Sequence, residues 1–269
     1  MRRDWDTNEA ARRWDLHAAE IASTYGADGD SLRQVVLNPA LLGLLPPVKG
    51  KRVLDAGCGE GYLSRMLAQA GASVVAIDYS PKMLEIARAR TAADVALEYR
   101  HGNFEKLSFL RARSFDIVVS NVVLQDLAGY EAAIGEAYRV LRPGGVFVFA
   151  ILHPCFSTPD RGWVTNDAGE KLHWKVDGYF DETVFELQWP AGAPDPILQY
   201  HRTLETYFRA VRQAGFMVDA LAEPRPSEEM LVEHPEYRDD LRMCHFLIFR
   251  TVKPLRRAKS RRTKGVADG

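Results

Sequence analysis

The sequence predicts a doubly wound α/β domain built on a mostly parallel sheet of seven strands. From residue 51 onward, short β-branched runs alternate with helical patterns, and a glycine-rich turn follows the first of these runs. Residues 146–152 are continuously apolar, as is typical of a strand covered on both faces. Strands that alternate with helices build a parallel sheet through right-handed crossovers, so these observations together indicate this fold class.

Each element is predicted by its own local pattern. Residues 5–45 look helical, with a glycine-rich break at residues 25–30. The expected strands are 53–55, 73–78, 95–99, 115–120, 146–152, 217–222 and 244–252. Between them, apolar residues at helical spacing predict helices after residue 62, across 133–141 and from Thr203. Ser80-Pro81 predicts a helix start, with serine as N-cap and proline in the first turn.

Residues 153–202 interrupt the alternation and are rich in aromatic side chains and prolines. A connection of this length is typical of a lid or binding loop. We therefore expect one domain over residues 1–252. It would consist of a helical cap (1–48), a core (49–152 and 203–252) and a substrate-covering insertion between the fifth strand and the last core helix (153–202). Residues 253–269 are expected to form a basic, disordered tail.

Composition and charge exclude several classes of protein. No apolar run is long enough to cross a membrane, and no apolar stretch follows the basic first residues, so neither a membrane span nor a secretory signal is expected. The three cysteines show no metal-binding spacing, which predicts reduced thiols, a cytoplasmic location and no metal site. The net charge is −1 although the tail is strongly basic, so the body is acidic, which argues against a nucleic-acid substrate.

Polar residues collect where the predicted strands end. Asp55, Asp78, Asn103, Ser120 and His153 each fall at or just after such an end. In a doubly wound sheet the ligand binds beyond the carboxyl ends of the strands. These five side chains are therefore expected on one rim of the sheet.

The segment from Val53 to Tyr62 carries the sharpest signal, with glycines at 57, 59 and 61 directly after a strand. Glycines allow a tight strand-to-helix turn and a close approach of backbone to ligand. Asp78, at the end of the next strand, suits a ribose diol. The G-x-G-x-G spacing differs from the one that seats a pyrophosphate. Asp55 would repel a pyrophosphate but suits a cationic amino-acid group.

At these motifs the chain resembles the class I S-adenosylmethionine-dependent methyltransferases, in the branch that acts on quinone precursors and secondary metabolites. The resemblance runs through residues 53–61, 76–83, Asn103, 115–116 and 139–145. It implies a Rossmann-like fold and S-adenosyl-L-methionine as cofactor, with S-adenosyl-L-homocysteine as product. The chain departs from the family at Asn103, where many members have Asp, and at Gln125-Asp126, where many have His.

The resemblance also implies a set of cofactor-binding residues. The glycine loop would approach the methionine moiety, with Asp55 near its ammonium group, and Asp78 would hold the ribose hydroxyls. Asn103 and Phe104 would contact the adenine, and Tyr25, with Trp14, would fold over the cofactor from the N-terminal helices. The full predicted set is Tyr25, Asp55, Gly57, Cys58, Gly59, Gly61, Asp78, Tyr79, Met83, Asn103, Phe104 and Ser120.

Two histidines are candidates for a general base. His153 follows the fifth strand at the expected rim, and His201 precedes the last core helix. Imidazole has a suitable pKa range for this role. The alternatives are that His153 shapes a loop and that His201 solvates a helix entry.

The predicted function is methyl transfer to a small, aromatic or heteroaromatic acceptor at oxygen, nitrogen or carbon. The sulfonium donor is already activated, so alignment for in-line displacement is the main requirement. The alternatives are a cofactor-binding protein of the same fold without methyl transfer and a nucleotide-dependent oxidoreductase, which the glycine spacing disfavours.

Overall fold

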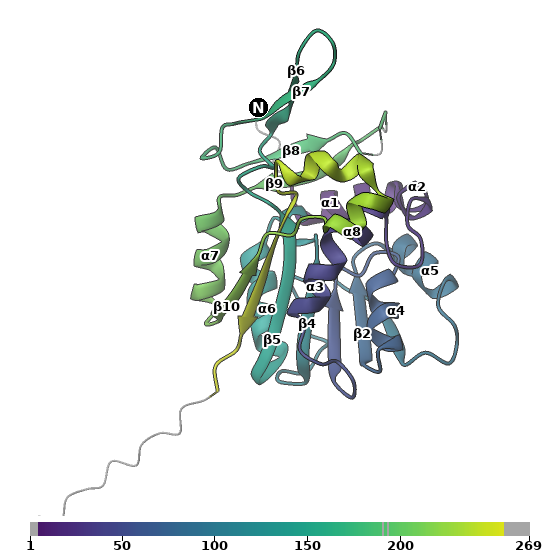
Figure 1. Cartoon of the computed structure of the whole chain (residues 1–269). Helices are drawn as coiled ribbons and strands as arrows, with labels where there is room; N and C mark the ends of the chain where they lie inside the picture. The colour runs from purple at the N-terminus through teal and green to yellow at the C-terminus, as the bar shows by residue number, and fades with distance from the viewer. Residues whose placement is uncertain (1–4, 190, 193, 256–269) are drawn as a thin grey trace, which may run out of the picture.

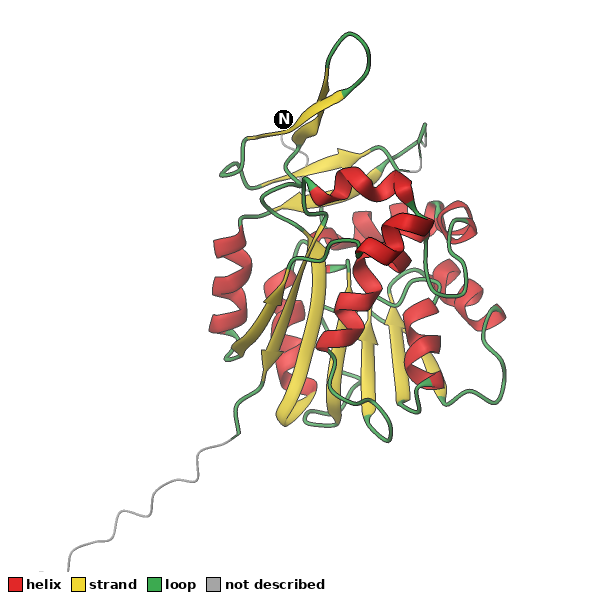
Figure 2. Cartoon of the chain, viewed as in Figure 1, coloured by secondary structure: helices red, strands yellow, loops and turns green. Residues whose placement is uncertain are grey.

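The computed structural model describes residues 5–189, 191–192 and 194–255, and its centre is a seven-stranded sheet. The strand order is β10-β11-β5-β4-β1-β2-β3, and β11 runs antiparallel to both of its neighbours. The strands are β1 (Arg52–Ala56), β2 (Ser73–Asp78), β3 (Leu97–His101), β4 (Phe115–Asn121), β5 (Leu141–Leu152), β10 (Met217–Ala222) and β11 (Phe246–Val252). The predicted fold class is confirmed (Figures 1 and 2).

Helices cover both faces of this sheet. Successive side chains of a strand point to opposite faces, and in the inner strands both sets are apolar, so both faces are buried under helices. Val74 of β2 packs in one apolar cluster and Val75 in the other. The first cluster includes residues of α3 (Asn38–Leu44), α4 (Tyr62–Gln69) and the π-helix η1 (Arg33–Leu37). The second includes residues of α6 (Tyr130–Val140) and α7 (Leu204–Gln213). The sheet is therefore doubly wound, as predicted.

The remaining helices lie around the carboxyl ends of the strands and along the β2–β3 side of the sheet. They are α1 (Thr7–Leu16), α2 (Ala18–Ser23), α5 (Pro81–Ala89), the short 3₁₀ turn η2 (Leu124–Asp126), α8 (Glu228–Glu233) and the 3₁₀ helix η3 (Pro235–Leu241). The predicted start of α5 is confirmed, because the Ser80 hydroxyl accepts a hydrogen bond from the Met83 amide at 3.1 Å.

Three strands differ from their predicted bounds by two residues or more, and one of them is β11, which begins at Phe246 rather than 244. β5 begins at Leu141 rather than 146, because Leu141 already pairs with Phe115 ahead of an irregular Pro-Gly-Gly stretch. β3 is shifted to residues 97–101, where it pairs in parallel with β2. Pairing with a neighbouring strand sets the boundaries of β5 and β3, and a local pattern does not contain that information.

The predicted insertion forms two separate two-stranded sheets above the carboxyl ends of the core strands (Figure 1). One pairs β6 (Asp160–Thr165) with β7 (Lys171–Asp177), and the other pairs β8 (Thr183–Leu187) with β9 (Ile197–His201). A second covering segment, residues 223–245 with α8 and η3, joins β10 to β11. No local pattern in the sequence predicted this segment.

The folded chain continues beyond Val252, which was the predicted end of the domain. The buried Lys253 ammonium donates to the carbonyls of Tyr138 and Leu141, at 2.5 and 2.8 Å. The rest of the predicted basic tail, residues 256–269, lies outside the described residues. Among the described residues, no helix is long and apolar enough to cross a membrane, and no cluster of three or more His, Cys, Asp or Glu could hold a metal ion.

Candidate cofactor and active site

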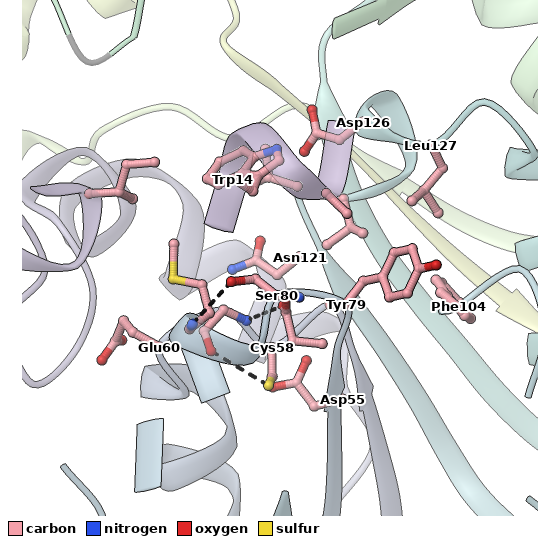
Figure 3. Close-up of a pocket in the computed structure, with 18 of the residues that line it drawn as sticks. Trp14, Asp55, Cys58, Glu60, Tyr79, Ser80, Phe104, Asn121, Asp126 and Leu127 are labelled. Atoms are coloured by element: carbon pink, nitrogen blue, oxygen red, sulfur yellow. Dashed lines mark hydrogen bonds between the residues drawn. The ribbon is translucent and has the colours of Figure 1, made fainter. Parts of the chain in front are cut away.

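One cavity opens at the carboxyl ends of β1, β2 and β4, beneath α1 (Figure 3). It holds about 1020 Å³ of space, including its open mouth. Ten of the predicted cofactor-binding residues line it: Tyr25, Asp55, Gly57, Cys58, Gly59, Asp78, Tyr79, Met83, Asn103 and Phe104. The rule that ligands bind at this edge of a parallel sheet therefore located the cavity correctly.

The glycine loop is shaped by two different constraints. Gly57 has φ +84°, and a Cβ there would lie 2.4 Å from Val123 of the loop after β4. Gly59 has φ +54°, but a Cβ there would meet no heavy atom within 4 Å. The first glycine is required by packing against Val123, whereas the second leaves the backbone bare where it faces the cavity.

Asp55 presents an unsatisfied carboxylate oxygen to the cavity. Its Oδ2 accepts a hydrogen bond from the Ser64 hydroxyl at 2.5 Å, while the buried Oδ1 has no hydrogen-bond partner among the described residues. Burial raises the pKa of Asp55 to about 7, and the negative charge of Asp78 adds to this effect while the Ser64 bond opposes it. A buried oxygen of this kind is costly unless a ligand donor meets it.

Asp78, at the end of β2, holds the glycine loop through hydrogen bonds to the backbone. Its Oδ2 accepts the Gly59 amide at 2.8 Å, and its Oδ1 accepts the Ser80 amide at 2.9 Å. Burial raises the pKa of Asp78, and these backbone hydrogen bonds oppose the rise. The carboxylate is thus fixed at the cavity wall with lone pairs left for a further donor, since each oxygen can accept more than one hydrogen bond.

The wall after β3 is formed by Gly102, Asn103 and Phe104. The Asn103 Oδ1 accepts the amide of Glu105 at 2.8 Å, so this side chain stabilises its own turn. Phe104 is buried and meets Phe147 edge-on, with 6.4 Å between ring centroids. Tyr79 stacks on His101 at 5.6 Å, and its hydroxyl donates to Asn8 of α1 at 2.8 Å.

Four predicted site residues lie outside the cavity lining. Gly61 caps α4 with φ +85°, and a Cβ there would collide with the Tyr99 hydroxyl. The Ser120 hydroxyl is buried and donates to the Ala56 carbonyl at 2.9 Å. The His153 Nδ1 accepts the Cys155 amide at 3.2 Å, so Nε2 carries a proton toward Glu223 at 2.8 Å. The His201 Nε2 donates to the Tyr179 carbonyl at 2.8 Å. The assignment of these residues to cofactor binding or catalysis stays a prediction.

The same cavity is also lined by Trp14, Tyr25, Arg33, Tyr62, Asn121 and Asp126, and we call these six residues together the acceptor half. In Figure 3, Asp126 and Asp55 lie at opposite ends, with Asn121 between them and Trp14 near the Asp126 end. Arg33, Tyr62, Asn121 and Asp126 are not among the site residues predicted from the sequence. The rule that ligands bind beyond the carboxyl ends of parallel strands could have identified Asn121 and Asp126, which lie at the end of the fourth strand and just after it.

Two buried polar atoms of the acceptor half have no hydrogen-bond partner among the described residues, the Trp14 Nε1 donor and the Asn121 Oδ1 acceptor. The Asn121 Nδ2 donates to the Tyr62 hydroxyl at 2.6 Å, and that hydroxyl donates to Asn38 at 3.1 Å. The Arg33 guanidinium lies over the Tyr25 ring at 4.9 Å and pairs with Asp30. The acceptor half therefore combines aromatic side chains with one hydrogen-bond donor and one hydrogen-bond acceptor that have no partner among the described residues.

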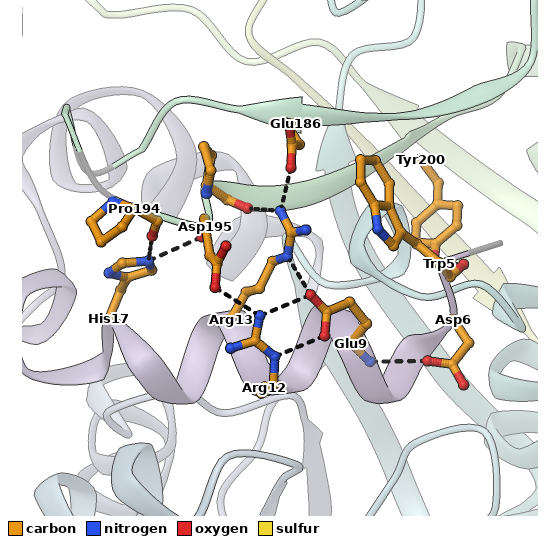
Figure 4. Close-up of polar contacts among 11 residues, drawn as sticks. Trp5, Asp6, Glu9, Arg12, Arg13, His17, Glu186, Pro194, Asp195 and Tyr200 are labelled. Carbon is orange, nitrogen blue, oxygen red and sulfur yellow. Dashed lines mark hydrogen bonds and ion pairs between the residues drawn. The ribbon is translucent and has the colours of Figure 1, made fainter. Parts of the chain in front are cut away.

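Helix α1 forms the roof, and the β8–β9 sheet holds it in place (Figure 4). Arg13 is only 3% exposed and donates to Glu9, Glu186 and the Pro196 carbonyl at 2.6–2.8 Å. The Tyr200 hydroxyl donates to the Trp5 carbonyl at 2.8 Å. The insertion therefore acts on the cavity indirectly, by holding the helix that covers it.

The residues present fit S-adenosylmethionine. The unpaired Asp55 Oδ1 suits an ammonium group, and the fixed carboxylate of Asp78 suits a ribose diol. The bare backbone at Gly59 allows close approach of the methionine part. When bound, this cofactor supplies an activated methyl group, and the chain's own residues bind it, orient it and exclude water.

Comparisons with known proteins agree with this geometry. A family model described as a methyltransferase domain matches residues 54–149. A malonyl-[acyl-carrier protein] O-methyltransferase of Pectobacterium atrosepticum is 46% identical over 42% of this chain and 43% of its own length. A ubiquinone biosynthesis O-methyltransferase of Xanthomonas oryzae is 34% identical over 52% of this chain and 60% of its own length. The chain thus spans about half the length of these curated relatives.

A solved structure matches over nearly the whole chain. It is an S-adenosylmethionine-dependent methyltransferase from Mesorhizobium loti, 31% identical, with a TM-score of 0.74 over 84% of this chain and 100% of its own. The chain belongs to the family of S-adenosylmethionine-dependent methyltransferases, and S-adenosylmethionine is its cofactor.

Proposed function

We propose that this methyltransferase acts on a small aromatic or heteroaromatic acceptor that enters the acceptor half of the cavity. The observation that carries the proposal is that one cavity is lined both by the residues that suit the cofactor and by Trp14, Tyr25 and Tyr62. Aromatic side chains bind flat rings by stacking or edge contacts. The unpaired Trp14 Nε1 and Asn121 Oδ1 supply one donor and one acceptor for orientation.

The cover over the cavity supports a small acceptor. Small-molecule sites are concave and lined mainly by apolar and aromatic side chains with a few polar groups, and this cavity has that kind of lining. The roof of α1 covers it, so a folded macromolecule would reach the methyl group only through a flexible arm or an extruded base. The names of the curated relatives state O-methylation, which supports an oxygen acceptor here.

The test is a screen with ¹³C-methyl-labelled S-adenosylmethionine and a filtered extract of bacterial small metabolites, read by mass spectrometry. We expect label in one or a few small aromatic products together with S-adenosylhomocysteine. Label that appears instead in added total RNA or protein would contradict the small-molecule proposal. Tight binding of S-adenosylhomocysteine without any transfer would favour a cofactor-binding role.

The matched control is Asp55→Asn, which keeps the shape of the site but removes the charge proposed to meet the cofactor ammonium. It should abolish product formation in the same extract at a cofactor concentration that saturates the wild type. An exposed change, Asp167→Asn in the turn between β6 and β7, should leave the product pattern unchanged.

A further inference from the structure

The turn η2, at the carboxyl end of β4, carries a buried carboxylate into the acceptor half of the cavity. Asp126 is the last residue of this turn and lines the cavity at the end opposite Asp55 (Figure 3). Its Oδ2 accepts a hydrogen bond from the side-chain Nε2 of Gln125 at 3.1 Å. Within the described residues, Asp126 takes part in no ion pair, so most of its hydrogen-bonding capacity remains for a bound molecule.

A buried arginine holds this turn from the insertion side. Arg202, directly after β9, donates to the carbonyls of Leu124, Leu127 and Ala128 at 3.1, 2.6 and 3.3 Å. Its guanidinium lies 4.0 Å from the centre of the Tyr130 ring. These bonds go to backbone oxygens on both sides of Asp126 rather than to its carboxylate. The carboxylate is thus rigidly placed without being neutralised by a direct partner.

Five other titratable groups that line the cavity are occupied or unsuited to take a proton. Asp55 and Asp78 belong to the cofactor half, and Glu60 pairs with Arg65 and Arg90 at 2.9 Å each. Burial raises the pKa of the Cys58 thiol well above its usual value and that of Tyr25 to about 12. The two histidines predicted as bases, at 153 and 201, lie outside the lining and use their ring nitrogens elsewhere.

We propose that Asp126 is a catalytic residue that takes the proton of the acceptor's O–H or N–H group, with Arg202 as its positioning residue. The inference rests on the proposed function and names the substrate class as a protic acceptor. The Asp126 carboxylate removes the proton while the lone pair of the acceptor oxygen or nitrogen forms the bond to the methyl carbon. The carbon–sulfur bond breaks, its electron pair stays on sulfur, and Asp126 later releases the proton to water.

The surroundings of Asp126 make its carboxylate a stronger base than an exposed one. Burial raises its pKa well above the usual value, and Asp78 acts in the same direction. The Gln125 hydrogen bond and the charges of Arg33 and Arg202 oppose the rise. The remaining titratable groups that face it are three tyrosines with raised pKa values, Tyr25, Tyr200 and Tyr207. Only the ionised carboxylate can take the proton, so the rate of methyl transfer should rise as the pH increases through the pKa of Asp126.

The test compares Asp126→Asn with His153→Gln and the exposed control Asp167→Asn in the ¹³C-methyl assay with the metabolite extract. Asp126→Asn should lower the rate of label transfer by about 10²–10⁴ and remove the acidic limb of the pH–rate profile. Its affinity for S-adenosylhomocysteine, measured by calorimetry, should stay close to that of the wild type, because Asp126 is not one of the residues assigned to the cofactor. Loss of rate and of the acidic limb in His153→Gln, with Asp126→Asn unaffected, would overturn the proposal.

A second readout needs no acceptor. In protein labelled with ¹³C at aspartate carboxyls, the resonance that disappears in Asp126→Asn should titrate clearly above the ordinary value of about 3.9. Arg202→Met should raise that midpoint further, because a positive charge is removed, whereas Arg202→Lys should shift it less. Titration at the ordinary value would overturn the proposal. If the wild type transfers no methyl group at all, the proposed function fails with it, but transfer that persists in Asp126→Asn overturns this inference alone.

Discussion

Asp55 shows how one residue couples the cofactor site to pH. Its carboxyl is about 1% exposed, one oxygen has no partner in the described structure, and burial raises its pKa to about 7. Near neutral pH the empty site therefore carries a proton for part of the time. A cofactor ammonium would favour the ionised carboxylate, so binding should release that proton.

We therefore expect the affinity for S-adenosylhomocysteine to be about tenfold weaker at pH 6 than at pH 8, the ratio of ionised Asp55 at those pH values for a pKa of about 7. Calorimetry in two buffers of different ionisation enthalpy measures the proton released. Asp55→Asn removes the titrating group and should abolish the pH dependence. Equal affinity at both pH values, with no proton release, would refute the assignment of Asp55 to the ammonium.

Alanine substitutions at Gly57 and Gly59 should affect different properties, the first stability and the second cofactor binding. Gly57→Ala places a Cβ against Val123 at a positive φ, so the free energy of unfolding should fall by about 1–3 kcal/mol. Gly59→Ala meets no neighbour within 4 Å and should cost only the backbone strain of about 1–2 kcal/mol, but its methyl group faces the ligand. Denaturant unfolding and calorimetry separate the two effects. A larger loss of cofactor affinity in Gly57→Ala than in Gly59→Ala would contradict this division.

At the scale of elements, α1 and the β8–β9 sheet form one covering unit that the local sequence patterns do not connect. The helix and the insertion are separated by more than 160 residues, yet Arg13 and Glu186 meet at 2.8 Å. Asp15, on the opposite side of α1, accepts hydrogen bonds from the Ser80 hydroxyl and the Lys82 amide at 2.7 and 2.9 Å. Helix α1 therefore forms hydrogen bonds both with the insertion and with the start of α5, which directly follows Asp78.

Arg12 and Arg13 provide a matched pair for testing this unit, since their side chains are 50% and 3% exposed. Arg13→Met should lower the free energy of unfolding by about 2–3 kcal/mol through the loss of charge-assisted hydrogen bonds. It should also speed amide hydrogen exchange across residues 7–16. Arg12→Met should change stability by less than about 1 kcal/mol, because exposed ion pairs contribute little. Equal effects of the two changes would show that the buried contacts do not hold the roof.

The sequence predicted the core better than its coverings. The strands from β1 to β5 and the cofactor wall follow from local signals, because glycine turns, caps and apolar runs act over a few residues. The acceptor half was predicted only in part: Arg33 and Tyr62 come from distant segments that only the fold brings together, whereas Asp126 follows the fourth strand and could have been identified from that position. The segment 223–245 was missed because its short helices carry no long apolar pattern.

At the scale of the whole molecule, the account requires that one cavity hold the cofactor at one end and a protic acceptor at the other. The sheet sets the floor through the ends of β1, β2 and β4, and α1 sets the roof. Because both sets of residues line the same cavity, we expect the methyl group to face Asp126 when the methionine part lies on the glycine loop.

The most direct test is a crystal structure of the full chain with S-adenosylhomocysteine. The account predicts that the ammonium of the ligand lies within hydrogen-bonding distance of the Asp55 Oδ1 and that the ribose hydroxyls lie within hydrogen-bonding distance of the Asp78 carboxylate. It also predicts that the sulfur faces the acceptor half, toward Asn121 and Asp126. A ligand that binds outside this cavity, or whose sulfur points away from Asp126, would contradict it.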